Sequence, residues 1–121
     1  MTFLLNDILE FFSNKKTYSF TLKQYQPSHS VVRLDVSELN AENVCLVFEG
    51  VEYIQFPLTW QSSGLYLASA EECVSILYKF KRGFEEIPEH YLAEQYKLYK
   101  FQHTEFEICI LAHAIYLTKD S

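Results

Sequence analysis

Histidine is the side chain best suited to acid–base and metal chemistry near neutral pH, and this chain has four widely separated ones. They are His29, His90, His103 and His113. A metal site needs several such ligands to converge with cysteines or carboxylates. The best local spacing is Glu86-x-x-x-His90, but Pro88 at its centre lets the two side chains align only in an irregular first turn of a helix. The sequence therefore predicts a solvated loop here and no metal site.

His113 lies within the apolar run 106–117, where an imidazole must be hydrogen-bonded or line a cavity. Two interpretations stay open. In one, His113 is a core or edge residue bonded to a hydroxyl group such as that of a tyrosine. In the other, it serves an aromatic pocket as an acid–base residue beside a carboxylate or Cys109. Cys109 is four residues away, about 13 Å along a regular strand, so the two cannot form a catalytic pair within one strand.

The chain has an odd number of cysteines, each flanked by apolar residues and none in a C-x-x-C pair: Cys45, Cys73 and Cys109. This pattern predicts reduced core cysteines in a reducing compartment. A nucleophilic thiol would need a neighbouring histidine or a helix N-terminus to lower its pKa. Cys73 comes closest, because it follows a plausible helix cap at Ser69.

Motifs of several large enzyme classes are absent. The glycines at 50, 64 and 83 stand alone, so no phosphate-binding glycine pattern exists, and neither G-x-S-x-G nor H-E-x-x-H occurs. No cofactor is expected, and a non-catalytic role is favoured over an enzyme.

Charge is distributed unevenly along the chain, whose formal net charge is −6. Residues 34–78 contain seven acids and no lysine, arginine or histidine, whereas the remainder contains nine acids and ten lysines and arginines, giving −7 against +1. Phosphate binding requires cations, so this span argues against a nucleic-acid partner. It is compatible with a basic protein partner.

The candidate binding residues combine acids and aromatic rings within this base-free span: Glu49, Glu52, Tyr53, Trp60 and Tyr66. Tyrosine and tryptophan supply large contact areas at protein interfaces. In the competing interpretation, Trp60 caps the core and the acids form a solvated face.

Hydrophobic periodicity predicts the elements of the first half. Apolar residues at helical spacing predict a short N-terminal helix over 4–12, with a polar exit at 13–16 that carries cations. Strict alternation predicts strands over 17–25 and 31–36 that form a hairpin. The richest β-branched and aromatic stretch, 44–57, follows a polar turn and predicts two strands joined or bent at Glu49-Gly50.

In the second half, a loop is expected over 58–64 and a short strand over 65–68. Ser69 and Glu72 form a capping box ahead of a helix over 70–82, although 73–80 also suits a strand. Residues 84–93 predict a loop with one helical turn after Pro88. Strands over 96–102 and 106–117 follow, with a turn at 103–105.

The 121 residues, 49% of them hydrophobic, fit one α+β domain spanning 1–121. We expect a twisted, mainly antiparallel sheet of about six to seven strands, with both helices on one face and a bulge or turn at Gly50. The N-terminus shows no secretory pattern and no stretch is long enough to span a membrane, so a cytoplasmic location is expected.

Three functional hypotheses follow. The first is a non-catalytic module that binds a basic protein through the acidic middle third, for example as an inhibitor or immunity-type protein. The second is a small-molecule-binding protein or small enzyme with an aromatic pocket near His113. The third is a structural homo-oligomer.

Overall fold

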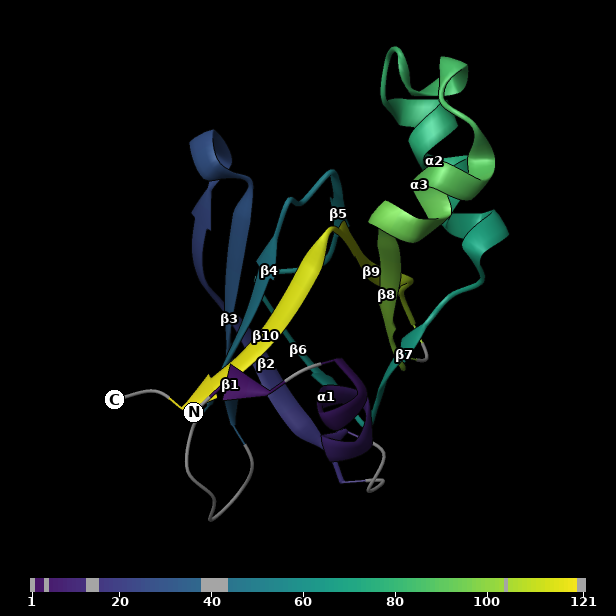
Figure 1. The fold of residues 1–121 in the computed structure, drawn as a ribbon. Coiled ribbons are helices and arrows are strands. Elements are labelled where there is room, and N and C mark those ends of the chain that lie inside the picture. The colour runs from purple at the N-terminus through teal and green to yellow at the C-terminus, as the bar shows by residue number, and fades with distance from the viewer. Residues whose placement is uncertain (1, 4, 13–15, 38–43, 104, 120–121) are drawn as a thin grey trace.

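The computed structural model describes residues 2–3, 5–12, 16–37, 44–103 and 105–119. They form one α+β domain in which two antiparallel sheets are combined with three α-helices (Figure 1). The predicted fold class, the N-terminal helix and the helix after Ser69 are confirmed. The described strands number ten and divide between two sheets, whereas the sequence predicted about six to seven strands in one.

Every pair of neighbouring strands is antiparallel. The first sheet has the order β1 (Thr2–Phe3), β10 (Ala114–Lys119), β4 (Val44–Glu49), β3 (Val31–Ser37), β2 (Tyr18–Gln26) and β6 (Thr59–Ser62). The second has the order β5 (Tyr53–Gln55), β9 (Ile108–Ala112), β8 (Lys97–Phe101) and β7 (Leu65–Leu67). Strands β2 and β3 form the predicted hairpin, joined by the short 3₁₀ turn η1 (Pro27–His29).

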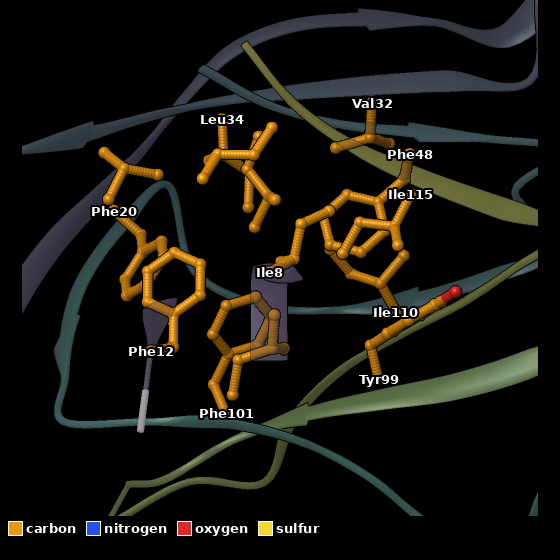
Figure 2. Close-up of a cluster of buried hydrophobic side chains, with 14 of the residues drawn as sticks. Ile8, Phe12, Phe20, Val32, Leu34, Phe48, Tyr99, Phe101, Ile110 and Ile115 are labelled. Carbon is orange, nitrogen blue, oxygen red and sulfur yellow. The ribbon is translucent and has the colours of Figure 1, made fainter. Parts of the chain in front are cut away.

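The main core lies between the two sheets, which face each other (Figure 2). Alternation along β4 turns Leu46 and Phe48 inward, and the rings of Phe48 and Tyr99 of β8 pack edge to face with 5.4 Å between centroids. Helix α1 (Leu5–Phe11) contributes Ile8 to the same core. Burial of each such side chain stabilises the fold by roughly 1.5–3 kcal/mol, so the two sheets are held together chiefly by this layer.

Helices α2 (Ala70–Phe80) and α3 (Glu89–Gln95) cover the outer face of the second sheet, with the 3₁₀ turn η2 (Phe84–Glu86) between them. The helical interpretation of residues 73–80 is therefore correct. The Ser69 hydroxyl accepts a hydrogen bond from the Glu72 amide at 3.1 Å, as predicted for an N-cap. Helix α3 extends the single turn expected after Pro88 to seven residues.

Segments β4–β5 and β9–β10 form one bent, two-stranded ribbon that runs through both sheets. Glu49 faces Ala114 and Tyr53 faces Leu111, so three residues on one segment oppose two on the other. This is a one-residue β-bulge, which bends a ribbon and increases its twist. It includes Gly50, with φ of +65°, where the sequence predicted a bulge or a turn.

Two sequence-based assignments were wrong, each for its own reason. The predicted strand 106–117 is divided at His113 into β9 and β10, which belong to different sheets, because the ribbon bends there. The predicted loop 58–64 contains β6, in which Trp60 lies opposite Phe20 of β2. Strand β6 has only four residues, too short for its alternation to be recognised.

Some predictions fall on residues outside the described ranges. These are Leu4 of the N-terminal helix, the helix exit at 13–15, the polar turn at 38–43 and Thr104. Within the described part of the chain, no helix is long and apolar enough to cross a membrane.

Candidate functional site

The candidate residues fall in three places. Glu49, Glu52, Tyr53 and His113 lie at or beside the bend of the ribbon, which we call the ribbon corner. Trp60 is 5% exposed and stacks between the rings of Phe20 and Phe56, so it belongs to the core, as the competing interpretation held. Tyr66 lies on β7, and no single surface unites the predicted set.

At the ribbon corner, the Tyr53 ring stacks on Phe80 of α2, with 5.1 Å between centroids, and Phe80 remains 52% exposed. The Glu52 carboxylate lies 3.4 Å from the Lys81 ammonium group. Lys79 and Arg82 are further exposed cations at this end of α2. The corner therefore combines acids with cations and is not the acidic surface that the sequence suggested.

The expected apolar setting of His113 is wrong. The side chain is exposed, and its ring lies 5.2 Å from that of Tyr96. Its Cβ would lie 2.5 Å from a Cβ added to Gly50, so a side chain at position 50 would overlap His113. His113 lines neither of the two hollows described below.

Bases from other parts of the chain fold against several acids of the base-free span. Lys81 pairs with Glu52, and Lys100 of β8 pairs with Glu72 at 2.6 Å. Lys23 of β2 lies 3.8 Å from Asp35. Charge along the sequence therefore overstates the negative charge on the surface of the middle third.

A second surface lies at the far end of the β8–β9 hairpin, beyond Phe101 and before Ile108. A hollow of about 310 Å³ opens there, and a second of about 370 Å³ shares Gln102, His103, Glu105 and Phe106 with it. The residues used below, which we call the hairpin end, are Tyr66, Glu72, Lys100, His103, Glu105, Phe106 and Glu107. Tyr66 is the member that the sequence had nominated for binding.

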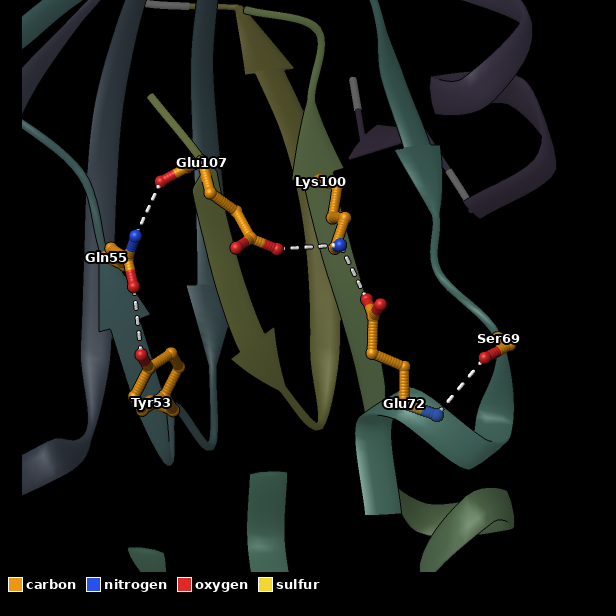
Figure 3. Close-up of polar contacts among 6 residues, drawn as sticks. All are labelled: Tyr53, Gln55, Ser69, Glu72, Lys100 and Glu107. Atoms are coloured by element: carbon orange, nitrogen blue, oxygen red, sulfur yellow. Dashed lines mark hydrogen bonds and ion pairs between the residues drawn. The ribbon is translucent and has the colours of Figure 1, made fainter. Parts of the chain in front are cut away.

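Lys100 links two carboxylates at the hairpin end (Figure 3). Its Nζ lies 2.7 Å from Glu107 Oε1 and 2.6 Å from Glu72 Oε2, and its side chain is 15% exposed. Hydrogen bonds to the Glu107 and Glu72 carboxylates raise the pKa of Lys100 above its usual range. Its positive charge is therefore permanent at neutral pH, and two negative groups share it.

Neighbouring polar groups hold Glu107 in position. The Gln55 side-chain amide donates to the Glu107 backbone carbonyl at 2.9 Å, and the Tyr53 hydroxyl donates to Gln55 Oε1 at 3.0 Å (Figure 3). These bonds tie the edge strand β5 to the residue before β9. The position of the Glu107 backbone is therefore fixed by tertiary contacts.

The imidazole of His103 orders the connection between β8 and β9. Its Nδ1 accepts the backbone N–H groups of Glu105 at 3.1 Å and Phe106 at 3.3 Å, an arrangement that requires the neutral ring. The ring also stacks on Phe106 at 4.9 Å, and Phe106 remains 54% exposed. Tyr66 also lines the 310 Å³ hollow and is 41% exposed. Two aromatic rings are thus presented to solvent.

The hairpin end has excess negative charge, because Glu72, Glu105 and Glu107 supply three carboxylates and Lys100 a single ammonium group. Glu105 forms no ion pair with another described residue and lines both hollows. Carboxylates beside exposed aromatic rings can bind a cation by charge and by the ring faces. Within the described ranges, no group of three or more histidine, cysteine or acidic side chains is arranged to hold a metal ion.

The three cysteine side chains are buried, as the sequence predicted. Burial raises the pKa of Cys73 and of Cys109 to about 11. Both thiols are therefore protonated at neutral pH, and the position of Cys73 near the start of α2 does not activate it.

Comparisons with protein-family models, curated proteins and solved structures found no match to this chain.

Glu105, Phe106 and Glu107 were missed as candidate binding residues because their sequence predicts a turn and the start of a strand. No signal in the sequence marks the Phe106 ring as exposed, since an apolar residue between two charged ones is typical of a strand with one buried face. Leu34, between Arg33 and Asp35 on β3, is fully buried in this way.

Proposed function

We propose that this chain is a non-catalytic protein-binding module that binds a basic protein through the hairpin end. One observation carries the proposal: the carboxylates of Glu105 and Glu107 line a hollow beside the exposed rings of Tyr66 and Phe106, and the ammonium group of Lys100 in the same lining is also held by Glu72. Aromatic residues dominate interface energetics, and complementary charge accelerates association. An inhibitor or immunity-type protein acting on a basic target is one concrete form of this function.

The hairpin end is preferred to the ribbon corner because of its charge. Glu52 at the corner is paired with Lys81, and Lys79 and Arg82 extend the positive charge at that end of α2. Glu49 remains exposed, which makes it a suitable competitor in the test below. Of the acids in the described part of the middle third, the proposed interface includes Glu72 alone.

A capture experiment tests this function. The chain is immobilised and exposed to a lysate of its source cells over a series of salt concentrations. We expect a basic protein to bind at low ionic strength and to be released as salt screens the charges. Glu105→Lys should abolish capture. Glu94→Lys makes the same charge change at an exposed position on α3, near the opposite end of β8, and should retain it.

Two results would contradict the proposal. One is the absence of any captured basic protein at low ionic strength. The other is capture that survives Glu105→Lys but is lost in Glu49→Lys, which would move the interface to the ribbon corner. Circular dichroism of each variant excludes unfolding as the cause of lost binding.

A further inference from the structure

We infer that the 310 Å³ hollow at the hairpin end receives one arginine side chain of the basic partner. The guanidinium group would lie against the carboxylate of Glu105, with the rings of Phe106 and Tyr66 beside it. This inference rests on the proposed function and specifies what the same surface recognises.

The size of the hollow suits a single long side chain. Sites for complete small-molecule ligands span about 300–1,000 Å³, and this hollow lies at the lower limit of that range. Its walls come from β7, β8, the start of β9 and the described residues between these two strands, and its lining includes the exposed residues Tyr66, Glu105 and Phe106.

The charges at the hollow favour a cationic group. Among the described residues of its lining, Lys100 alone is a lysine or arginine, and its ammonium group is already held by Glu72 and Glu107. The Glu105 carboxylate remains without an ion pair among the described residues. The Glu107 side chain is 60% exposed, and Lys100 contacts one of its oxygens. An incoming cation would therefore meet uncompensated carboxylate oxygens.

The aromatic rings favour guanidinium over ammonium. A guanidinium group is planar, is weakly hydrated, stacks on aromatic faces and binds a carboxylate through two parallel hydrogen bonds. The ring of His103 stacks on Phe106 with 4.9 Å between centroids, and with its Nδ1 accepting a backbone N–H group it adds no positive charge that would repel the ligand. An ammonium group has no flat face to match the ring.

Titration of the ¹⁵N-labelled chain by NMR tests the inference, with N-acetyl-arginine-N-methylamide as the probe. We expect saturable shifts of the His103, Glu105 and Phe106 amides. The citrulline analogue, a neutral isostere, should bind at least about tenfold more weakly, because it loses a charge-assisted hydrogen bond. Glu105→Gln should weaken the arginine probe by about the same factor, whereas Glu94→Gln should leave it unchanged.

Equal binding of the arginine and citrulline probes would overturn the inference, as would shifts confined to other parts of the chain. Glu105-dependent protein capture without binding of the arginine probe would overturn the arginine assignment and leave the proposed function standing. If the probe bound in a Glu105-dependent way but no protein were captured, the hollow would still be a site for an arginine side chain, and the proposed protein partner would be contradicted.

Discussion

Cys73 and Cys109 lie in the layer between α2 and the second sheet, each 2% exposed. Burial raises the pKa of each thiol to about 11, whereas an unfolded cysteine titrates near about 8.5. Below about pH 8.5 the thiols are protonated in both states, so they add no pH dependence. Between the two values the unfolded chain releases protons that the folded chain retains, so alkali favours unfolding.

The free energy of unfolding should therefore fall as pH rises from 8.5 toward 11. The loss should be on the order of 2 kcal/mol per thiol by about pH 10. Urea unfolding at pH 7 and pH 10 measures it. The Cys73→Ala/Cys109→Ala variant will differ in stability already at pH 7, because side-chain volume is lost. The informative quantity is therefore the change in the free energy of unfolding between pH 7 and pH 10, which should be smaller in the variant. If the variant lost as much free energy of unfolding between pH 7 and pH 10 as the unsubstituted protein, the thiols would not be the cause of the loss in alkali.

At the scale of elements, α2 starts where a local signal predicts, but a residue distant in the sequence determines the partner of one of its capping side chains. The Ser69 hydroxyl caps the Glu72 amide as the capping-box pattern predicts. The Glu72 carboxylate, which in a complete capping box would return to the Ser69 amide, instead lies 2.6 Å from Lys100 on β8. The ion pair joins the helix N-terminus to the sheet beneath it.

Ser69→Ala should lower the free energy of unfolding by about 1 kcal/mol, because the Glu72 amide loses its hydrogen-bond acceptor. Ser75→Ala is the matched control, since Ser75 is exposed in the middle of the same helix. That change should be neutral or stabilising by a few tenths of a kcal/mol, because alanine has the higher helix propensity. Chemical denaturation compares the two variants. Equal effects would mean that the cap contributes nothing specific.

At the scale of the whole molecule, the bent ribbon joins the two sheets. His113 donates its amide to the Glu49 carbonyl at 3.0 Å, and Glu52 donates to Leu111 at 2.9 Å, so backbone pairing continues through the bend. Gly50 allows the bend for two reasons: its φ is positive, and its missing Cβ leaves room for His113. The relative placement of the sheets therefore depends on a contact between residues 63 positions apart (113 − 50).

Gly50→Ala should destabilise the protein more than Gly83→Ala does. Both glycines have positive φ, but a Cβ at Gly83 meets nothing within 4 Å, whereas at Gly50 it would overlap the His113 Cβ. Gly83→Ala should cost about 1–2 kcal/mol from backbone strain, and Gly50→Ala a further 1–3 kcal/mol, roughly, from overpacking. Thermal unfolding measures both. Adding His113→Gly to Gly50→Ala should recover part of the additional stability lost in Gly50→Ala. If nothing were recovered, overlap with the His113 side chain would not be the cause of that loss.

The sequence alone determined the features that depend on neighbouring residues. Alternation predicted the β2–β3 hairpin, the Ser69 cap predicted α2, and Gly50 predicted a bulge or turn between β4 and β5. Apolar flanking residues predicted the buried cysteines. These signals are local because backbone conformation and hydrogen bonding within a turn are set by residues a few positions apart.

Only the tertiary structure decided how distant segments combine. It divided the strands between two sheets, turned Trp60 inward and His113 outward, and paired acids of the base-free span with lysines from elsewhere. It also brought Tyr66 beside Glu105 and Phe106, about forty residues later in the chain. Burial and ion pairing depend on which faces meet, and a single sequence carries no direct record of those contacts. The sequence thus established an acidic α+β domain, whereas the fold determined where its uncompensated charge lies.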